Sequence, residues 1–254
     1  QFRGLIVSAN QVLVPPIAAL HEKTPEKIQP VYLGSYQLLF YLAFPVYSSV
    51  IICTPAISRL WIGHYENTFV IFGFLLAIGW LMNTLAAPAF FANLGIGKLR
   101  WNVIGHITIA VLNAGLGFVS GKLFGGLGVV IAWVISLAAG SSIVYISYHI
   151  EHKIPVIELL PKASRKIFIA CLSGIILSAF IHKQYSQLVN IMQLNAMIFI
   201  PFAIVLSVFL WIHPLRNRVI GWITNDLLNM EIRHSKSLWT NIPSIASKCK
   251  EEQK

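Results

Sequence analysis

The chain of 254 residues is 56% hydrophobic and 11% charged, and its mean hydropathy is +0.72. Soluble domains carry charge on about a quarter of their residues, so this composition excludes an ordinary soluble protein. The formal net charge of +10 at pH 7 comes from basic residues that are dispersed among the predicted loops. That distribution favours membrane-flanking turns over binding of RNA or DNA.

Long stretches without Asp, Glu, Lys or Arg indicate the membrane spans. The four longest each exceed the ~20 residues that cross a bilayer, and two shorter ones are further helix candidates. The long stretches lie between Lys27 and Arg59, Glu66 and Lys98, Lys122 and Glu151, and Lys183 and Arg216, and the shorter ones between Arg100 and Lys122 and between Lys166 and Lys183. They lack the alternation of barrel strands, so the sequence predicts an all-α, polytopic transmembrane helix bundle.

About seven hydrophobic segments are expected to be helices. They cover residues 2–20, 32–58, 69–94, 102–120, 126–149, 166–182 and 195–213. Because the chain opens at Gln1 inside an apolar run, we expect the first helix to stand at a truncated start. Residues 1–213 are predicted to form one transmembrane lobe, and the polar residues 214–254 a tail.

The first segment carries polar residues on one face. Arg3 and Asn10 share that face, with Gln11 at its edge, and we expect the helix to break at Pro15 and Pro16. A guanidinium inside a span is costly enough to indicate a binding role. An arginine so close to the start could equally extend to the membrane surface.

The third segment ends in the sequence ANLGIGKLRW, which contains G-x-G-K. A phosphate-binding loop of that kind would need a glycine at Ala92, a hydroxyl residue at Leu99 and a strand before it. These mismatches favour a turn in which Gly95 and Gly97 end the helix and Lys98 meets the membrane surface.

Polar residues also follow faces of the central segments. Asn83 lies on a small-residue face of segment 69–94, and a polar stripe follows segment 102–120. The stripe consists of Asn102, His106, Ile109, Asn113, Gly117 and Ser120. Two interpretations remain open: hydrogen bonds that hold helices together, and contacts with a ligand. For His106, a structural hydrogen-bonded imidazole is the alternative to a titrating switch.

Segment 126–149 carries a face of small residues. Gly128, Ala132, Ser136 and Gly140 recur every four residues, which permits close approach of a neighbouring helix. We therefore expect this face to pack inside the bundle.

Basic residues predict the orientation, because Lys and Arg beside spans are retained in the cytoplasm. Ten fall on one side: Lys23, Lys27, Lys98, Arg100, Lys153, Lys162, Arg165, Lys166, Arg216 and Arg218. Three fall on the other: Arg59, Lys122 and Lys183. The tail is therefore expected in the cytoplasm.

Acidic residues are absent from the central segments, which leaves no paired carboxylates for acid–base catalysis and no acidic proton relay. His149 and His152 flank Glu151 in what we expect to be a solvated loop. No spacing typical of metal ligands or of a nucleophile and its base is recognisable. We therefore expect a protein that is not an enzyme, with no metal and no cofactor.

Five short motifs follow one another in a recognisable order. They are VLVPPIAAL, RLWIGHYE, ANLGIGKLRWN, LNAGLGF and FGGLGVVIAWVIS. Together, over residues 2–150, they resemble the C-terminal lobe of a polysaccharide or lipid-linked oligosaccharide flippase of the O-antigen type. That family belongs to the multidrug/oligosaccharidyl-lipid/polysaccharide exporter superfamily.

The resemblance implies a two-lobe transporter of the inner (cytoplasmic) membrane that works by alternating access. Its expected partners are a lipid-linked glycan, membrane lipids and a missing N-terminal lobe of the same protein, and no nucleic acid. Arg3 matches an arginine position of related flippases, and the remaining candidate substrate-binding residues come from the polar faces: Asn10, Gln11, Asn83, His106 and Asn113. Residues 166–213 would form an appended helix pair on which lipid tails could dock.

Other functions stay open on the residues alone. A cation-coupled multidrug antiporter of the same superfamily would need a membrane carboxylate, which these segments lack. A membrane-bound enzyme of lipid-linked sugar metabolism would need a site in a loop, where residues 149–152 are the candidates. A structural membrane subunit would need only the hydrogen bonds between helices.

Overall fold

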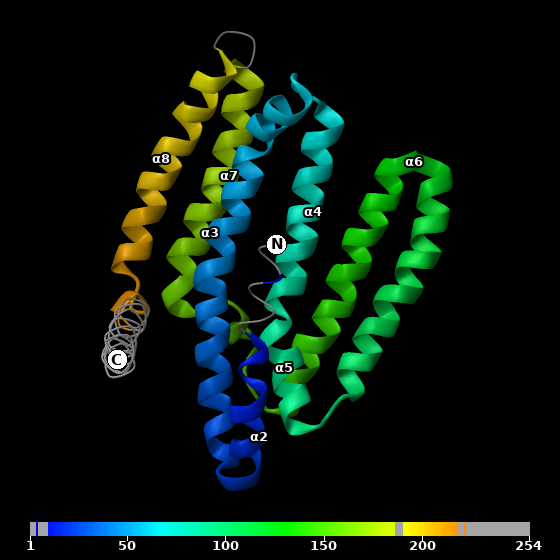
Figure 1. The fold of residues 1–254 in the computed structure, drawn as a ribbon, viewed down its shortest axis with the longest axis vertical. Coiled ribbons are helices and arrows are strands. Elements are labelled where there is room, and N and C mark those ends of the chain that lie inside the picture. The colour runs from blue at the N-terminus through cyan, green and yellow to red at the C-terminus, as the bar shows by residue number, and fades with distance from the viewer. Residues whose placement is uncertain (1–3, 5–9, 186–189, 218–220, 222–254) are drawn as a thin grey trace, which may run out of the picture. The chain divides into compact units, whose positions relative to one another are not determined.

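A computed structural model describes residues 4, 10–185, 190–217 and 221. The chain divides into two compact units, Gln1–Leu210 and Trp211–Lys254. In the first unit the described residues form helices joined by short turns, without a strand, which confirms the predicted all-α bundle (Figure 1). The boundary that we predicted at residue 213 stays a prediction.

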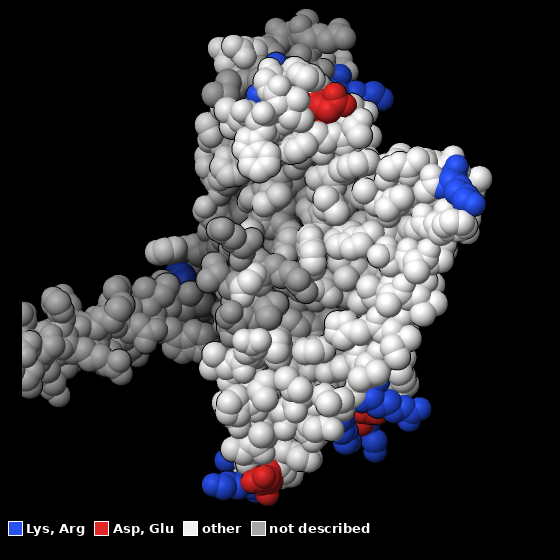
Figure 2. Space-filling model, turned by 45° about the vertical axis from the view of Figure 1, so that its right-hand side comes forward, with Lys and Arg blue, Asp and Glu red and all other residues white. Residues whose placement is uncertain are grey.

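Five helical stretches of the described residues are long and apolar enough to cross a membrane. They are Pro25–Ile62, Asn67–Ile96, Arg100–Glu151, Arg165–Gln184 and Gln193–Ile212. On the face displayed in Figure 2, charged side chains gather at the ends of the helices, and an uncharged band covers α4 and α6 between them. The chain is therefore a membrane protein with transmembrane helices.

The first described helices are α2 (Val14–Lys23) and α3 (Ile28–Ile62), which are joined by the 3₁₀ turn η1 (Pro25–Lys27). Residues 12–13 form a turn just before α2, so the predicted break is confirmed. Pro15 and Pro16 lie in the first turn of α2, where a missing N–H removes no helical hydrogen bond. Most of the predicted helix before this turn lies outside the described residues.

The predicted helix 69–94 is in fact two helices, α4 (Asn67–Leu85) and α5 (Ala87–Ile96). Pro88 has no N–H, and its ring crowds the carbonyl of Thr84 four residues earlier. The helix is consequently interrupted at Ala86, which caps the end of α4 and precedes α5.

The G-x-G-K sequence ends α5, as predicted. Gly97 follows the last helical residue with a left-handed φ of 81°, a conformation that favours glycine. The N–H of Lys98 donates to the carbonyl of Asn93 at 2.9 Å and closes the helix end. The side chain of Lys98 is exposed.

α6 (Arg100–Glu151) is a hairpin whose two helical legs correspond to the predicted segments 102–120 and 126–149 (Figure 1). The legs meet at Gly125, where φ is 60° and ψ is −143°. Residues that carry a side chain rarely adopt this backbone conformation, so a glycine at this position permits the chain to reverse direction between the two legs. Trp101 Nε1 donates to Glu151 Oε1 at 2.7 Å, which joins the two far ends of the hairpin.

The small-residue face packs against the other leg of the hairpin, as the sequence predicts. Its buried members are Gly128, Ala132, Ser136 and Gly140. A Cβ atom built on Gly105 would lie 2.8 Å from the carbonyl oxygen of Gly140, and one built on Gly140 would collide with the carbonyl oxygen of Gly105. The two backbones therefore touch without intervening side chains.

The remaining elements are η2 (Val156–Leu159), η3 (Lys162–Ser164), α7 (Arg165–Tyr185) and α8 (Ile191–Ile212). The two α-helices correspond to the predicted segments 166–182 and 195–213. α7 packs on α3, and Gly174 of α7 leaves room for the ring of Phe202 in α8. Tyr41 of α3 donates to the carbonyl of Leu210 at 3.2 Å.

Replacing Gly140 by Ala tests the contact between the two legs. The added methyl group must push the legs apart, so we expect a loss of about 1–3 kcal/mol in unfolding free energy. The control is Gly115→Ala, because Gly115 is exposed on the same helix hairpin and has no atom near its Cβ position. There the substitution should stabilise the helix by about 0.5–1 kcal/mol. Equal thermal stability of the two variants in detergent would contradict this packing.

Candidate functional site

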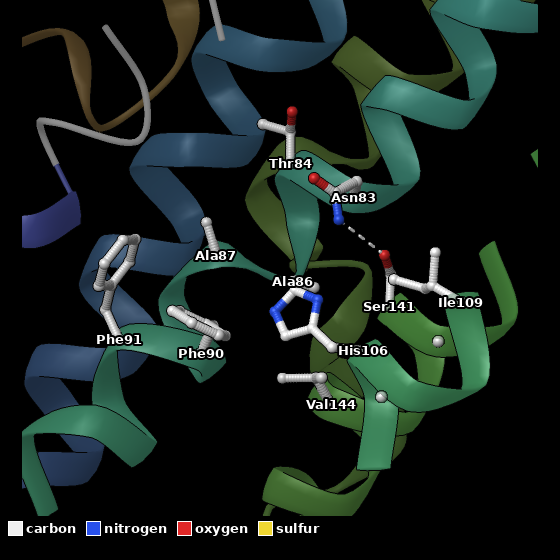
Figure 3. A pocket seen from close by; sticks show the side chains of 12 residues that line it. Asn83, Thr84, Ala86, Ala87, Phe90, Phe91, His106, Ile109, Ser141 and Val144 are labelled. Carbon is white, nitrogen blue, oxygen red and sulfur yellow. Dashed lines mark hydrogen bonds between the residues drawn. The ribbon is translucent and has the colours of Figure 1, made fainter. Parts of the chain in front are cut away.

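A cavity of about 140 Å³ opens where α4 gives way to α5, beside the α6 hairpin (Figure 3). We call it the break cavity. From α4, the break and α5 it is lined by Asn83, Thr84, Ala86, Ala87, Phe90 and Phe91. From the two legs of α6 it is lined by Gly105, His106, Ile109, Gly140, Ser141 and Val144.

Amide, hydroxyl and imidazole groups meet in the break cavity. Asn83 Nδ2 donates to Ser141 Oγ at 3.1 Å, which joins α4 to the second leg of α6 (Figure 3). The exposed side chain of His106 lies edge-on to the ring of Phe90, with 5.5 Å between the ring centroids. The polar groups thus come from different helices and converge on one space.

Two buried asparagines hold the α5 wall of the cavity in place. Asn93 Nδ2 donates to Asn102 Oδ1 at 3.0 Å, and Asn102 Nδ2 donates to the carbonyl oxygen of Phe90 at 2.9 Å. The two side chains are 1% and 3% exposed, so no water competes for these hydrogen bonds. They fix α5 to the first turn of α6 and thereby place Phe90 beside His106.

Sequence reasoning included Asn102 in the polar stripe but did not single out Asn93. The available signal was an amide inside the apolar run FFANLG, because an amide within hydrocarbon must find a partner in the protein. The partner itself, nine residues later, could not be chosen without the turn that brings α5 against α6.

Two of the predicted candidate residues, Asn83 and His106, line the break cavity together. Three others do not line it: the half-buried Asn113, the buried Asn10 and the exposed Gln11. Arg3 lies outside the described residues. The polar stripe therefore divides by position: Asn102 binds other protein groups, whereas His106 faces the cavity.

We expected a solvated loop at residues 149–152. This prediction is wrong for His149, which is fully buried in the last turn of α6. The hydroxyl of Tyr32 in α3 lies 2.8 Å from His149 Nε2, and the rings of Tyr32 and Tyr148 pack at 4.4 Å. The signal was the four-residue spacing of the buried face, which continues from Gly140 through Val144 to Tyr148. This cluster fastens α3 to the end of α6.

The break cavity offers amide, hydroxyl and imidazole groups between aromatic and aliphatic walls. None of its lining residues is Asp, Glu, Lys or Arg. Among the described residues, no group of three or more His, Cys, Asp or Glu side chains could hold a metal ion. Such a lining can donate to and accept from a neutral polar ligand that carries hydroxyl groups.

Comparisons with known proteins give no independent assignment. No protein-family model matches the chain, and no curated protein and no solved structure is significantly similar to it. The resemblance to an exporter lobe therefore stays a prediction, and any function has to be inferred from the residues and their geometry.

Cysteine accessibility tests whether the break cavity holds water. In a background without native cysteines, His106→Cys should react with a small water-soluble thiol reagent, because reaction requires a hydrated thiolate. Two neighbours on the same leg are controls: Asn102→Cys is buried, and Ile107→Cys, at a position 57% exposed, should face lipid. In proteoliposomes, both control cysteines should react about tenfold more slowly than the cysteine at position 106, because a thiol away from water does not ionise to the reactive thiolate. Equal labelling at positions 106 and 107 would mean that His106 also faces lipid.

Proposed function

We propose that the chain is one lobe of a membrane transporter that moves a lipid-linked oligosaccharide or polysaccharide precursor across the membrane by alternating access. The observation that carries this proposal is the break cavity, where amide, hydroxyl and imidazole groups from three helical segments converge among apolar membrane-spanning helices. The motif resemblance over residues 2–150 supports the same function.

Polar groups among membrane helices are costly unless they are satisfied, and they often mark binding sites or pathways. In the break cavity, Asn83 and Ser141 bond to each other, while the imidazole of His106 is exposed. Interhelical hydrogen bonding alone accounts for the first pair but does not require an exposed imidazole beside it. A polar ligand supplies the partner that such a group needs.

The interruption between α4 and α5 adds to this argument. Transporters commonly build their substrate sites where a membrane helix is discontinuous, because the interruption lines a cavity instead of facing lipid. Ala86 and Ala87, at the interruption, line the break cavity. The site and the break therefore coincide.

The lining also bears on the kind of substrate. Hydroxyl-rich sugars match amide, hydroxyl and imidazole groups, whereas a cation-coupled antiporter would need a carboxylate, and the cavity lining contains none. A cavity of about 140 Å³ is smaller than the ~300 Å³ of typical ligand pockets. We therefore propose that this lobe contacts only part of the substrate and that the rest contacts a second lobe. The phosphates of the substrate would be bound by residues such as Arg3.

A flipping assay on the full-length protein in proteoliposomes tests the proposal. The substrate is a polyprenyl-diphosphate-linked oligosaccharide with a fluorescent sugar, and a membrane-impermeant quencher added outside reports how much has crossed. His106→Ala should slow flipping about tenfold, the cost of one hydrogen bond of roughly 1.4 kcal/mol. Thr108→Ala is the control, because Thr108 bonds to the carbonyl of Ile104 and does not line the cavity.

The outcomes separate the alternatives. Failure of the wild-type protein to flip the substrate, together with proton-driven export of a cationic dye, would identify an antiporter instead. Normal flipping by His106→Ala would remove the break cavity from the transport path. Loss of flipping in both variants would point to a general folding defect, which the melting temperature of each variant reveals.

We further propose that the protein lies in the cytoplasmic membrane with its tail inside. The support is the distribution of basic residues between the two ends of the helices. The end with ten basic residues includes the α5–α6 turn, and the end with three includes the tip of the α6 hairpin. Basic residues beside spans are retained on the cytoplasmic side.

Single cysteines test this orientation in intact cells. Cysteines at Lys98 and Arg165 should be shielded from an impermeant thiol reagent, whereas one at Lys183 should be labelled, since it lies at the end of α7 on the side with few basic residues. Permeabilised cells supply the control, because all three positions should then react. Labelling at position 98 from outside would reverse the proposed orientation.

A further inference from the structure

A second cavity, of about 890 Å³, is lined by α3, α4, the second leg of α6 and α7. Three basic side chains lie along its lining: Arg59 from the last turn of α3, and His182 and Lys183 from the last turn of α7. We call it the cationic cavity. The ends of α3 and α7 lie side by side (Figure 1). Most of the remaining lining is apolar and includes Ile51, Phe74, Leu127 and Ile131.

The basic groups of the cationic cavity have no carboxylate partner among the described residues. The ion pair that the described residues contain joins His64 to Glu66 at 3.6 Å, and neither residue lines the cationic cavity. The carboxylate of Glu66 also accepts a hydrogen bond from the N–H of Thr68. Arg59 Nε and His182 Nε2 are buried without a hydrogen-bond partner in the described part of the chain. Either side chain can therefore turn toward a ligand without breaking a hydrogen bond.

We propose that the cationic cavity binds an anionic phospholipid of the surrounding bilayer. Its phosphate would lie between Arg59 and Lys183, and its acyl chains along the apolar lining. The arginine fork can hold two phosphate oxygens at once, and lysine adds a point charge. Basic groups at helix ends meet lipid headgroups at this level of the membrane. This inference does not depend on transport.

The shape of the cavity favours a lipid over a free anion. Inorganic phosphate would occupy the basic end alone and leave the apolar lining exposed, whereas acyl chains remove that surface from water. Trp61, 82% exposed two residues after Arg59, and Tyr65, which lines the cavity, are aromatic residues of the kind found at the membrane–water interface. The headgroup and the interface are therefore placed at the same end of the helices.

Native mass spectrometry of the purified full-length protein, with defined lipids added, tests the proposal. The probes are phosphatidylglycerol, phosphatidylcholine and inorganic phosphate. Phosphatidylglycerol should bind about thirtyfold more tightly than phosphatidylcholine, which corresponds to roughly 1 kcal/mol for each of two cations. The double variant Arg59→Gln/Lys183→Gln should lose this preference.

Lys122→Gln is the matched control. Lys122 lies at the tip of the α6 hairpin and is predicted on the same side of the membrane as Arg59 and Lys183. Its Nζ lies 4.1 Å from the centroid of the Phe118 ring, and it does not line the cavity. It should keep the full preference for phosphatidylglycerol. The melting temperature of each variant without added lipid identifies one that fails to fold.

A second variant tests the apolar part without changing charge. Ala179→Trp places a large ring at a lining position of α7 and should weaken binding of both lipids about tenfold or more. Unchanged binding in this variant and in the double variant would overturn the proposal. Competition by millimolar inorganic phosphate against phosphatidylglycerol would show a free-anion site instead, and it would equally overturn the lipid assignment.

Discussion

The contact between Gly105 and Gly140 determines how the break cavity is assembled. Neither residue has a side chain, so the two legs of α6 approach until their backbones touch. The residues that follow them in sequence, His106 and Ser141, are thereby brought to the same space from opposite legs. Larger side chains at these positions would separate the legs and divide the polar groups between two surfaces.

The second determinant is Pro88. By ending α4 at Leu85 it lets α5 begin in a new position, and the hydrogen bonds of Asn93 and Asn102 then hold α5 against the start of α6. Asn83 precedes the break and bonds to Ser141, so one polar link lies on either side of it. A continuous helix would have placed Phe90 elsewhere.

Features that depend on local chemistry were predictable from the sequence. Charge-free stretches gave the spans, Gly97 and the turn before Pro15 ended helices as expected, and the four-residue spacing of small side chains identified a packed face. The break at Pro88 was missed because a proline in an apolar run is also compatible with a continuous helix, as Pro45 and Pro55 are in α3. The four-residue spacing that runs from Gly140 to Tyr148 signals that the buried face continues to the end of α6, but the partner of His149, Tyr32, is 117 residues away and no local pattern identifies it.

The seam between α4 and α6 links the two cavities. α4 contributes Phe74 to the cationic cavity and Asn83 to the break cavity, and the second leg of α6 also lines both. Between them on α4, a Cβ atom on Gly79 would lie 2.7 Å from the ring of Trp133, and Trp80 packs edge-on against the same indole at 5.2 Å. Trp133 therefore fits tightly against α4 and leaves little freedom for the two helices to slide.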